Sequence, residues 1–160
     1  SLEDMLDAAS GRIRVMIELK ASGHETGFVQ EVLTLIKEKG MEGQCSIASM
    51  DLGLLKETKA LMPEMETVYI SAFLISNRYD IPYVDCYSVE TSSLSRETVA
   101  HVHGEDKQVF GWTANSIRTL DKLIQYGVDG LVTDNVALAE YCMMTRGRDL
   151  LVDDLTDLFF

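Results

Sequence analysis

The sequence lacks the features that would place it in several common classes of protein. Its three cysteines, Cys45, Cys86 and Cys142, are far apart and form no CxxC pair. That spacing argues against a structural zinc site and favours free thiols in a reducing compartment. No stretch approaches the roughly 18–20 consecutive apolar residues that a membrane-spanning helix needs. Residues 1–7 are acidic and lack the basic region that opens a signal peptide.

Basic residues are scarce as well. The chain has 14 lysines and arginines against 26 aspartates and glutamates, which gives a formal net charge of −12. Nucleic acids and anionic membrane surfaces are bound through clusters of basic side chains, so this balance argues against both as partners. An anionic small molecule could bind only with local help from a bound cation or from a few well-placed basic groups.

Strand-like and helix-like segments alternate along the chain. Apolar runs rich in β-branched residues predict buried parallel strands, and apolar residues at helical spacing predict the helices between them. The predicted strands are Ile13–Lys20, Gln44–Met50, Thr67–Ser71, Tyr83–Val89, Gln108–Thr113 and Val128–Thr133. The predicted helices are Glu25–Lys39, Asp51 to about Leu61, a helix that starts at Ser95, Ser116–Tyr126, and Asp134 to about Met144. Residues 73–79 fit either a short helix or an irregular connection.

Short polar side chains and glycines mark the expected helix ends. Asp51, Ser95 and Asp134 are predicted N-caps, because a side-chain oxygen at that position can accept a hydrogen bond from an unpaired backbone N–H. Gly40 and Gly127 are predicted to end their helices, because glycine adopts the left-handed conformation that commonly follows a last turn.

This alternation predicts an α/β protein built from right-handed β-α-β units with a parallel sheet. Two architectures fit it: a doubly wound open sheet, or part of a (β/α)8 barrel, which takes about 250 residues when complete. Periodicity alone does not choose between them. We expect one domain over residues 1–145, followed by a C-terminal tail over residues 146–160.

Several predicted strand ends carry recognisable motifs. They are Ile17–Lys20 (IELK), Ser49–Asp51 (SMD), Asp85–Ser88 (DCYS), Trp112–Asn115 (WTAN) and Gly127–Asp134 (GVDGLVTD). In this order and spacing they resemble the glycerophosphodiester phosphodiesterase family. Each motif alone is weak, but together they extend the resemblance over nearly the whole chain, from residue 2 to about residue 141.

The resemblance implies a (β/α)8 TIM-type barrel, of which this chain would hold about six of the eight β/α units. It also implies metal-dependent hydrolysis of glycerophosphodiesters to glycerol 3-phosphate and an alcohol, a reaction of lipid and glycerol metabolism. The catalytic histidines of the family lie upstream of the segment that this chain resembles. We therefore expect no catalytic residue of the family within these residues, and no activity from them alone.

Glu18 resembles a metal-binding carboxylate of the family, and its oxygen ligand suits Mg²⁺ or Ca²⁺. Independently of the resemblance, Glu18 interrupts an apolar strand near its carboxyl end, where the sites of such barrels are built. A buried carboxylate there would need a cation. The alternative is a structural ion pair with Lys20, two residues further along the same strand face.

By the same resemblance Lys20 meets the substrate phosphate, and Trp112, the only tryptophan, lines the pocket beside the glycerol end. The alternatives are an ion-paired or exposed lysine and ordinary core packing of the indole. Asn115 is predicted to be a helix cap rather than a ligand. None of the three histidines, His24, His101 and His103, matches a catalytic position of the family.

Two other readings stay open. One is a non-catalytic binding or regulatory module derived from a barrel, and the other is an unrelated open α/β domain that binds a small ligand. An incomplete barrel would expose two apolar strand edges, which invite a homo-oligomer. We expect a small-molecule glycerophosphodiester as the partner, and a cytoplasmic location or attachment to a membrane through an upstream domain.

Overall fold

The computed structural model describes residues 1–20, 27–73 and 79–145. These residues form two compact units. The first comprises residues 1–20, 27–71 and 79–88, and the second comprises residues 72–73 and 89–145. His24, the tail over residues 146–160 and most of the uncertain segment 73–79 lie outside the described residues.

The predicted alternation of strands and helices is confirmed. Among the described residues six strands follow one another in chain order in the sheet, β1 to β6, as expected for successive β-α units. They are β1 (Val15–Glu18), β2 (Cys45–Ser49), β3 (Glu66–Ser71), β4 (Cys86–Glu90), β5 (Gln108–Trp112) and β6 (Gly130–Leu131). Within residues 1–20, 27–73 and 79–145, no helix combines the length and the apolar character that crossing a membrane requires.

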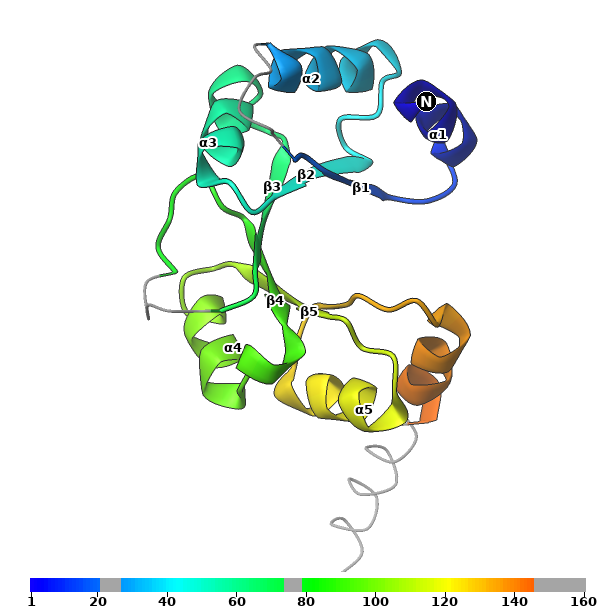
Figure 1. The fold of residues 1–160 in the computed structure, drawn as a ribbon, viewed down its shortest axis with the longest axis vertical. Helices are drawn as coiled ribbons and strands as arrows, with labels where there is room; N and C mark the ends of the chain where they lie inside the picture. Colours follow the sequence, from blue (N-terminus) through cyan, green and yellow to red (C-terminus); the bar gives the residue numbers. More distant parts are fainter. Residues whose placement is uncertain (21–26, 74–78, 146–160) are drawn as a thin grey trace, which may run out of the picture. The chain divides into compact units, whose positions relative to one another are not determined.

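In the first unit, β1, β2 and β3 pair in parallel, with Val15 beside Cys45 and Ser46 beside Glu66. Figure 1 shows the helices of this unit, which are α1 (Leu2–Ala9), α2 (Phe28–Glu38) and α3 (Leu52–Leu61). All five residues of β2 are buried, so this central strand is covered on both faces. The core consists of apolar side chains from α1, α2, β2, α3 and β3: Leu6, Val29, Ile36, Ile47, Leu55 and Val68.

The second unit is built on β5 and β6, which pair in parallel with Phe110 beside Gly130. Its helices are the short 3-10 turn η1 (Thr91–Ser93), α4 (Arg96–His103), α5 (Ile117–Tyr126) and a further helix that the structure describes over residues 136–145. Leu94 and Val99 are both buried at the start of α4. Gly127 ends α5 with φ of 77°, as predicted.

The helix starts confirm two predicted caps and correct two others. The Asp51 carboxylate accepts from Gly53 N at 2.7 Å, and Ser95 caps α4. The prediction that Asp134 caps the last helix is wrong, because Asn135 Oδ1 accepts from Leu138 N at 3.1 Å instead.

Asn115 is likewise no cap, because Ser116 accepts the N-terminal hydrogen bond of α5. Both Asn115 and Asp134 lie one residue before the real cap, and their side chains bond to each other.

Most of the strands are shorter than predicted, and β4 and β6 show why. β4 begins at Cys86 rather than Tyr83, because Pro82 lies in a turn in which Val84 N donates to Ile81 O. β6 contains only Gly130 and Leu131, although Val132 continues the backbone bonding to β5.

An aspartate just before a strand ties down the amino end of the preceding strand in each unit. Asp85 Oδ2 accepts from Thr67 N at 2.8 Å and from Lys59 Nζ at 2.7 Å. In the second unit, Asp129 Oδ2 accepts from Val109 N at 2.7 Å and lies 2.9 Å from His103 Nε2. The aspartate of the GVDG motif is therefore structural, and it gives His103 a partner that the sequence did not indicate.

Gly111 lies where β5 packs closely on α5. A Cβ built on Gly111 would lie 2.6 Å from a methyl group of Leu123, which is fully buried. Such a distance is well inside van der Waals contact, so a side chain at position 111 would have to displace the helix or the leucine.

We expect Gly111→Ala to lower the free energy of unfolding by about 1–3 kcal/mol, the usual cost of overpacking a filled core. Urea denaturation would measure it, with Gly43→Ala as the matched control, because a Cβ at Gly43 would meet nothing within 4 Å. Equal midpoints for the two variants would contradict this account of the β5–α5 contact.

We expect Asp85→Ala to lower the free energy of unfolding by about 1–3 kcal/mol, because it leaves the Thr67 N–H without its acceptor and removes the partner of Lys59. The exposed Glu57 on α3 offers a control, since Glu57→Ala should change stability by no more than about 0.5 kcal/mol. Thermal denaturation followed by circular dichroism would compare the two, and an unaffected Asp85→Ala protein would show that other groups hold the start of β3.

Candidate functional site

The carboxyl end of β1 carries both charged residues that the sequence singled out. Glu18 is the last residue of β1, and Lys20 follows two positions later. Their side chains form an ion pair with Lys20 Nζ 3.3 Å from Glu18 Oε2. The ion pair that was the structural alternative is therefore present. It is not a buried one, because 38% of the Glu18 side chain and 77% of the Lys20 side chain are exposed.

Leu19 fixes the backbone between these two charges. Its side chain is buried, and its N–H donates to Ala48 O at 2.7 Å, which extends the pairing with β2 beyond Glu18. Ser49 Oγ donates to Leu19 O at 2.8 Å and accepts from Asp51 N at 3.0 Å. The serine of the SMD motif thus holds the Glu18–Lys20 segment against β2.

Sequence reasoning missed this role of Ser49. The available clue was a small polar residue at the carboxyl end of an otherwise apolar strand. Ser49 is almost completely buried, so its hydroxyl must find partners within the protein. The local backbone supplies both of them.

The carboxylate of Glu18 fits one ligand position of an oxygen-rich metal site. It lies at the strand end, it is accessible, and a hard cation prefers oxygen. Within residues 1–20, 27–73 and 79–145, no three histidine, cysteine, aspartate or glutamate side chains form a cluster that could hold a metal ion. Glu18 would therefore need further ligands from outside these residues.

Trp112 is the last residue of β5, in the second unit, and its side chain is half-buried. Two residues later Ala114 is fully buried, and its N–H donates to Val132 O at 2.8 Å. The indole thus stands at the carboxyl end of its strand, the end at which the functional groups of such folds gather.

Asn115 joins the segment after β5 to the segment after β6. Its Oδ1 accepts from Thr133 Oγ1 at 3.0 Å and from Asp134 N at 2.9 Å. Its Nδ2 donates to Asp134 Oδ2 at 2.7 Å. These three residues, Asn115, Thr133 and Asp134, are called the Asn115 latch below.

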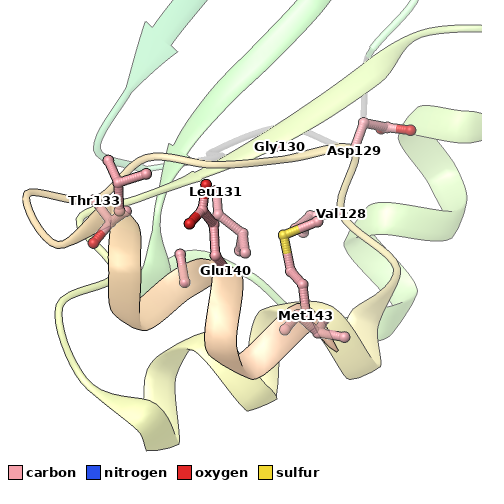
Figure 2. A pocket seen from close by; sticks show the side chains of 10 residues that line it. Val128, Asp129, Gly130, Leu131, Thr133, Glu140 and Met143 are labelled. Atoms are coloured by element: carbon pink, nitrogen blue, oxygen red, sulfur yellow. The ribbon is translucent and has the colours of Figure 1, made fainter. Parts of the chain in front are cut away.

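An apolar hollow of about 500 Å³ opens beside β6 (Figure 2). Figure 2 shows Leu131, Glu140 and Met143 at the hollow and the carboxylate of Asp129 turned away from it, toward the partners already described. The walls carry mainly aliphatic groups. The hollow therefore offers a surface for packing rather than a set of acid and base groups for catalysis.

Two buried tyrosines of the first unit, Tyr79 and Tyr87, also serve packing rather than catalysis. Tyr87 lies edge-on to Tyr69 and Tyr79, and its hydroxyl donates to Tyr79 O at 3.2 Å. Burial raises the pKa of Tyr87 to about 12. A phenol that stays protonated at neutral pH serves packing here and does not act as a base.

Comparison with known proteins places these features in context. The chain is 26% identical to a glycerophosphodiester phosphodiesterase of Bacillus altitudinis over 141 residues, which cover 83% of this chain and 58% of the relative. It is 25% identical to the protein YhdW of Bacillus subtilis over 140 residues, again 58% of the relative. The chain thus spans less than two thirds of the length of these curated relatives.

Solved structures share the fold. A glycerophosphodiester phosphodiesterase from Parabacteroides distasonis superposes with a TM-score of 0.81 at 20% identity, over 91% of this chain and 64% of the other. A phosphodiesterase from Oleispira antarctica, solved with the product sn-glycerol-3-phosphate, gives a TM-score of 0.81 at 19% identity, over 89% and 60%. The expectation of an incomplete TIM-type barrel, rather than a doubly wound open sheet, is thereby confirmed.

The sequence pattern of the glycerophosphoryl diester phosphodiesterase family matches residues 5–138, which is most of the chain. That range contains every motif on which the resemblance was based, from IELK to GVDGLVTD. The chain belongs to the glycerophosphoryl diester phosphodiesterase family.

Proposed function

We propose that this chain contributes to the metal-dependent hydrolysis of glycerophosphodiesters to glycerol 3-phosphate and an alcohol. The observation that carries the proposal is the pair Glu18 and Lys20, accessible at the carboxyl end of β1 in a member of this family. Residues from outside the 160 would complete the site, because the curated relatives are much longer than the part that this chain matches.

Lys20 is the group that would meet the substrate. Its ammonium is exposed, so it can move from Glu18 to a phosphoryl oxygen without leaving a buried charge behind. In a chain with a net charge of −12, such a local positive group is needed to bind an anion.

Glu18 would supply one oxygen ligand to Mg²⁺ or Ca²⁺. When bound, the ion would offset negative charge on the phosphoryl oxygens. The buried Leu19 and the Ser49 hydrogen bond keep the Glu18 backbone in place, so the carboxylate would need little ordering on binding. Trp112 would line the pocket at the glycerol end of the substrate.

Two further parts of the proposal concern the chain by itself and its location. We propose that the 160 residues alone do not hydrolyse the substrate, since Glu18 has no further metal ligands clustered with it among the described residues. We also propose a cytoplasmic location, or attachment to a membrane through an upstream domain.

The decisive test is the release of glycerol 3-phosphate from glycerophosphocholine with Mg²⁺ or Ca²⁺, and again with a chelator. We expect activity only from a longer protein that adds the two missing β/α units at the N-terminus, and we expect the chelator to abolish it. In that protein Glu18→Gln should lower kcat/KM at least about 100-fold, because a metal ion supplies several kcal/mol of charge stabilisation.

Arg14→Gln is the control, since Arg14 is also exposed and ion-paired, to Glu66 at 2.5 Å, but lies at the amino end of β1. It should leave kcat/KM within about threefold, as expected for a surface ion pair. If neither the chain nor the longer protein hydrolyses several phosphodiesters, the non-catalytic binding module becomes the better account.

We also propose that copies of this chain associate through the two end strands of the sheet order, β1 and β6. A hollow of about 480 Å³ beside β1 is lined by apolar residues and by Arg12 and Arg14. The hollow beside β6 is lined mainly by apolar residues, and its polar residues are Asp129, Thr133 and the exposed Glu140. The β1 side of one copy therefore matches the β6 side of another in both apolar character and charge.

We expect light scattering at high protein concentration to show dimers or larger assemblies. Met143→Glu should shift the protein to monomer, because it places a charge in the β6 hollow, whereas Met144→Glu should not. Both methionines are exposed on the same helix, but only Met143 lines the hollow. A monomeric wild-type protein, or identical behaviour of the two variants, would argue against this mode of association.

A further inference from the structure

The segments that follow β5 and β6 are connected more tightly than their exposed positions suggest. Backbone bonding continues past both strands, with Val132 N donating to Gly111 O at 2.9 Å and Ala114 N donating to Val132 O at 2.8 Å. The Asn115 latch adds three bonds immediately beyond this point. Strand pairing is thereby prolonged by side chains after regular β structure has ended.

The chemistry of the latch requires an amide at position 115. The two lone pairs of Asn115 Oδ1 accept one bond from a hydroxyl and one from a backbone N–H, while Nδ2 donates to a carboxylate. A carboxylate could accept but could not donate, and an apolar residue could do neither. The bond to Asp134 is charge-assisted, which makes it the strongest of the three.

The latch also leaves two helix starts untouched. Ser116 caps α5 and Asn135 caps the helix of residues 136–145, each one residue after a member of the latch. Thr133 Oγ1 accepts from Asn135 N at 3.0 Å while it donates to Asn115. Other residues cap the two helices. The Asn115–Asp134 bond therefore acts on the segments between strand and helix, which it holds together.

That segment begins with Trp112. Only Thr113 and the buried Ala114 separate Trp112 from the latch, so the backbone between them has little freedom to move. Trp112 is thus held on its amino side by β5 and on its carboxyl side by the latch.

We infer that Asn115 is a positioning residue that fixes Trp112 for substrate binding, acting through its bond to Asp134. The inference deepens the proposed function and rests on it for the identity of the substrate. It concerns the position of a binding residue, and Asn115 itself does not contact the substrate.

The test uses Trp112 as its own probe, because it is the only tryptophan of the chain. In Asn115→Asp, two acceptors would face each other where a donor and an acceptor lie 2.7 Å apart. We expect a red-shifted Trp112 emission, stronger quenching by acrylamide, and about tenfold faster hydrogen exchange of the Ala114 N–H, since one charge-assisted bond is lost. The exchange of Ile47, in the first unit, should not change.

The reciprocal double variant, Asn115→Asp with Asp134→Asn, restores one amide facing one carboxylate and should return all three measurements to wild-type values. The pH dependence provides a second readout. Two facing carboxylates favour sharing a proton, so the Asn115→Asp emission should approach that of wild type as the pH falls from 8 toward about 4. The double variant should show no such change.

Asn135→Asp is the matched control, because it adds the same charge to a neighbouring residue and aspartate remains a good N-cap. If Asn115→Asp proves unfolded, Asn115→Ala replaces it in the same comparison. Unchanged Trp112 emission and Ala114 exchange in the single variant, or a failure of the double variant to restore them, would overturn the inference.

Substrate binding is measured separately in the longer, active protein. There Asn115→Asp should raise KM with little change in kcat, and the double variant should restore KM. A normal KM despite a mobile Trp112 would overturn the positioning role. An inactive longer protein would instead count against the proposed function, while the fluorescence and exchange results, obtained without substrate, would still report on the latch.

Discussion

The pairing of neighbouring parallel strands is the constraint on which the rest of this structure depends. Parallel pairing brings the carboxyl ends of β1, β2 and β3 to one edge within the first unit, and those of β5 and β6 to one edge within the second. It also leaves unpaired N–H groups at the amino ends, which Asp85 and Asp129 satisfy. Asp85 and Asp129 thus serve the amino ends of the strands, and the candidate functional groups Glu18, Lys20 and Trp112 lie at the carboxyl ends.

This division explains why one family motif can serve two purposes. GVDGLVTD contains Asp129, which bonds to the start of β5, and Asp134, which belongs to the latch beyond the end of β6. The two aspartates are five residues apart, with a two-residue strand between them. The motif therefore forms hydrogen bonds on both sides of β6. Both of its carboxylates bond to other groups of the protein.

Periodicity predicted the order of strands and helices well, because burial of apolar faces is a property of each segment by itself. The caps Asp51 and Ser95 were predictable for the same reason, as their partners lie two and three residues away. The roles of Asn115 and Asp134 were not predictable in this way. A short polar residue near a helix start can cap that helix or bond to a residue far away in the sequence, and here each bonds to the other, nineteen residues away. The choice of a barrel came from the family resemblance alone, and Glu18 was located correctly at a strand end while the support from Ser49 was missed.

Exposed and buried side chains alternate at the carboxyl end of β1, and this alternation links the positions of its two charged residues. Glu18 and Lys20 flank a buried leucine whose carbonyl is held by the hydroxyl of Ser49, on the neighbouring strand. The two charges therefore share one backbone anchor, and any change that shifts it moves both together. The uncharged Ser49 thus steadies the backbone between the two charges, so the loss of its hydroxyl would loosen Glu18 and Lys20 at the same time.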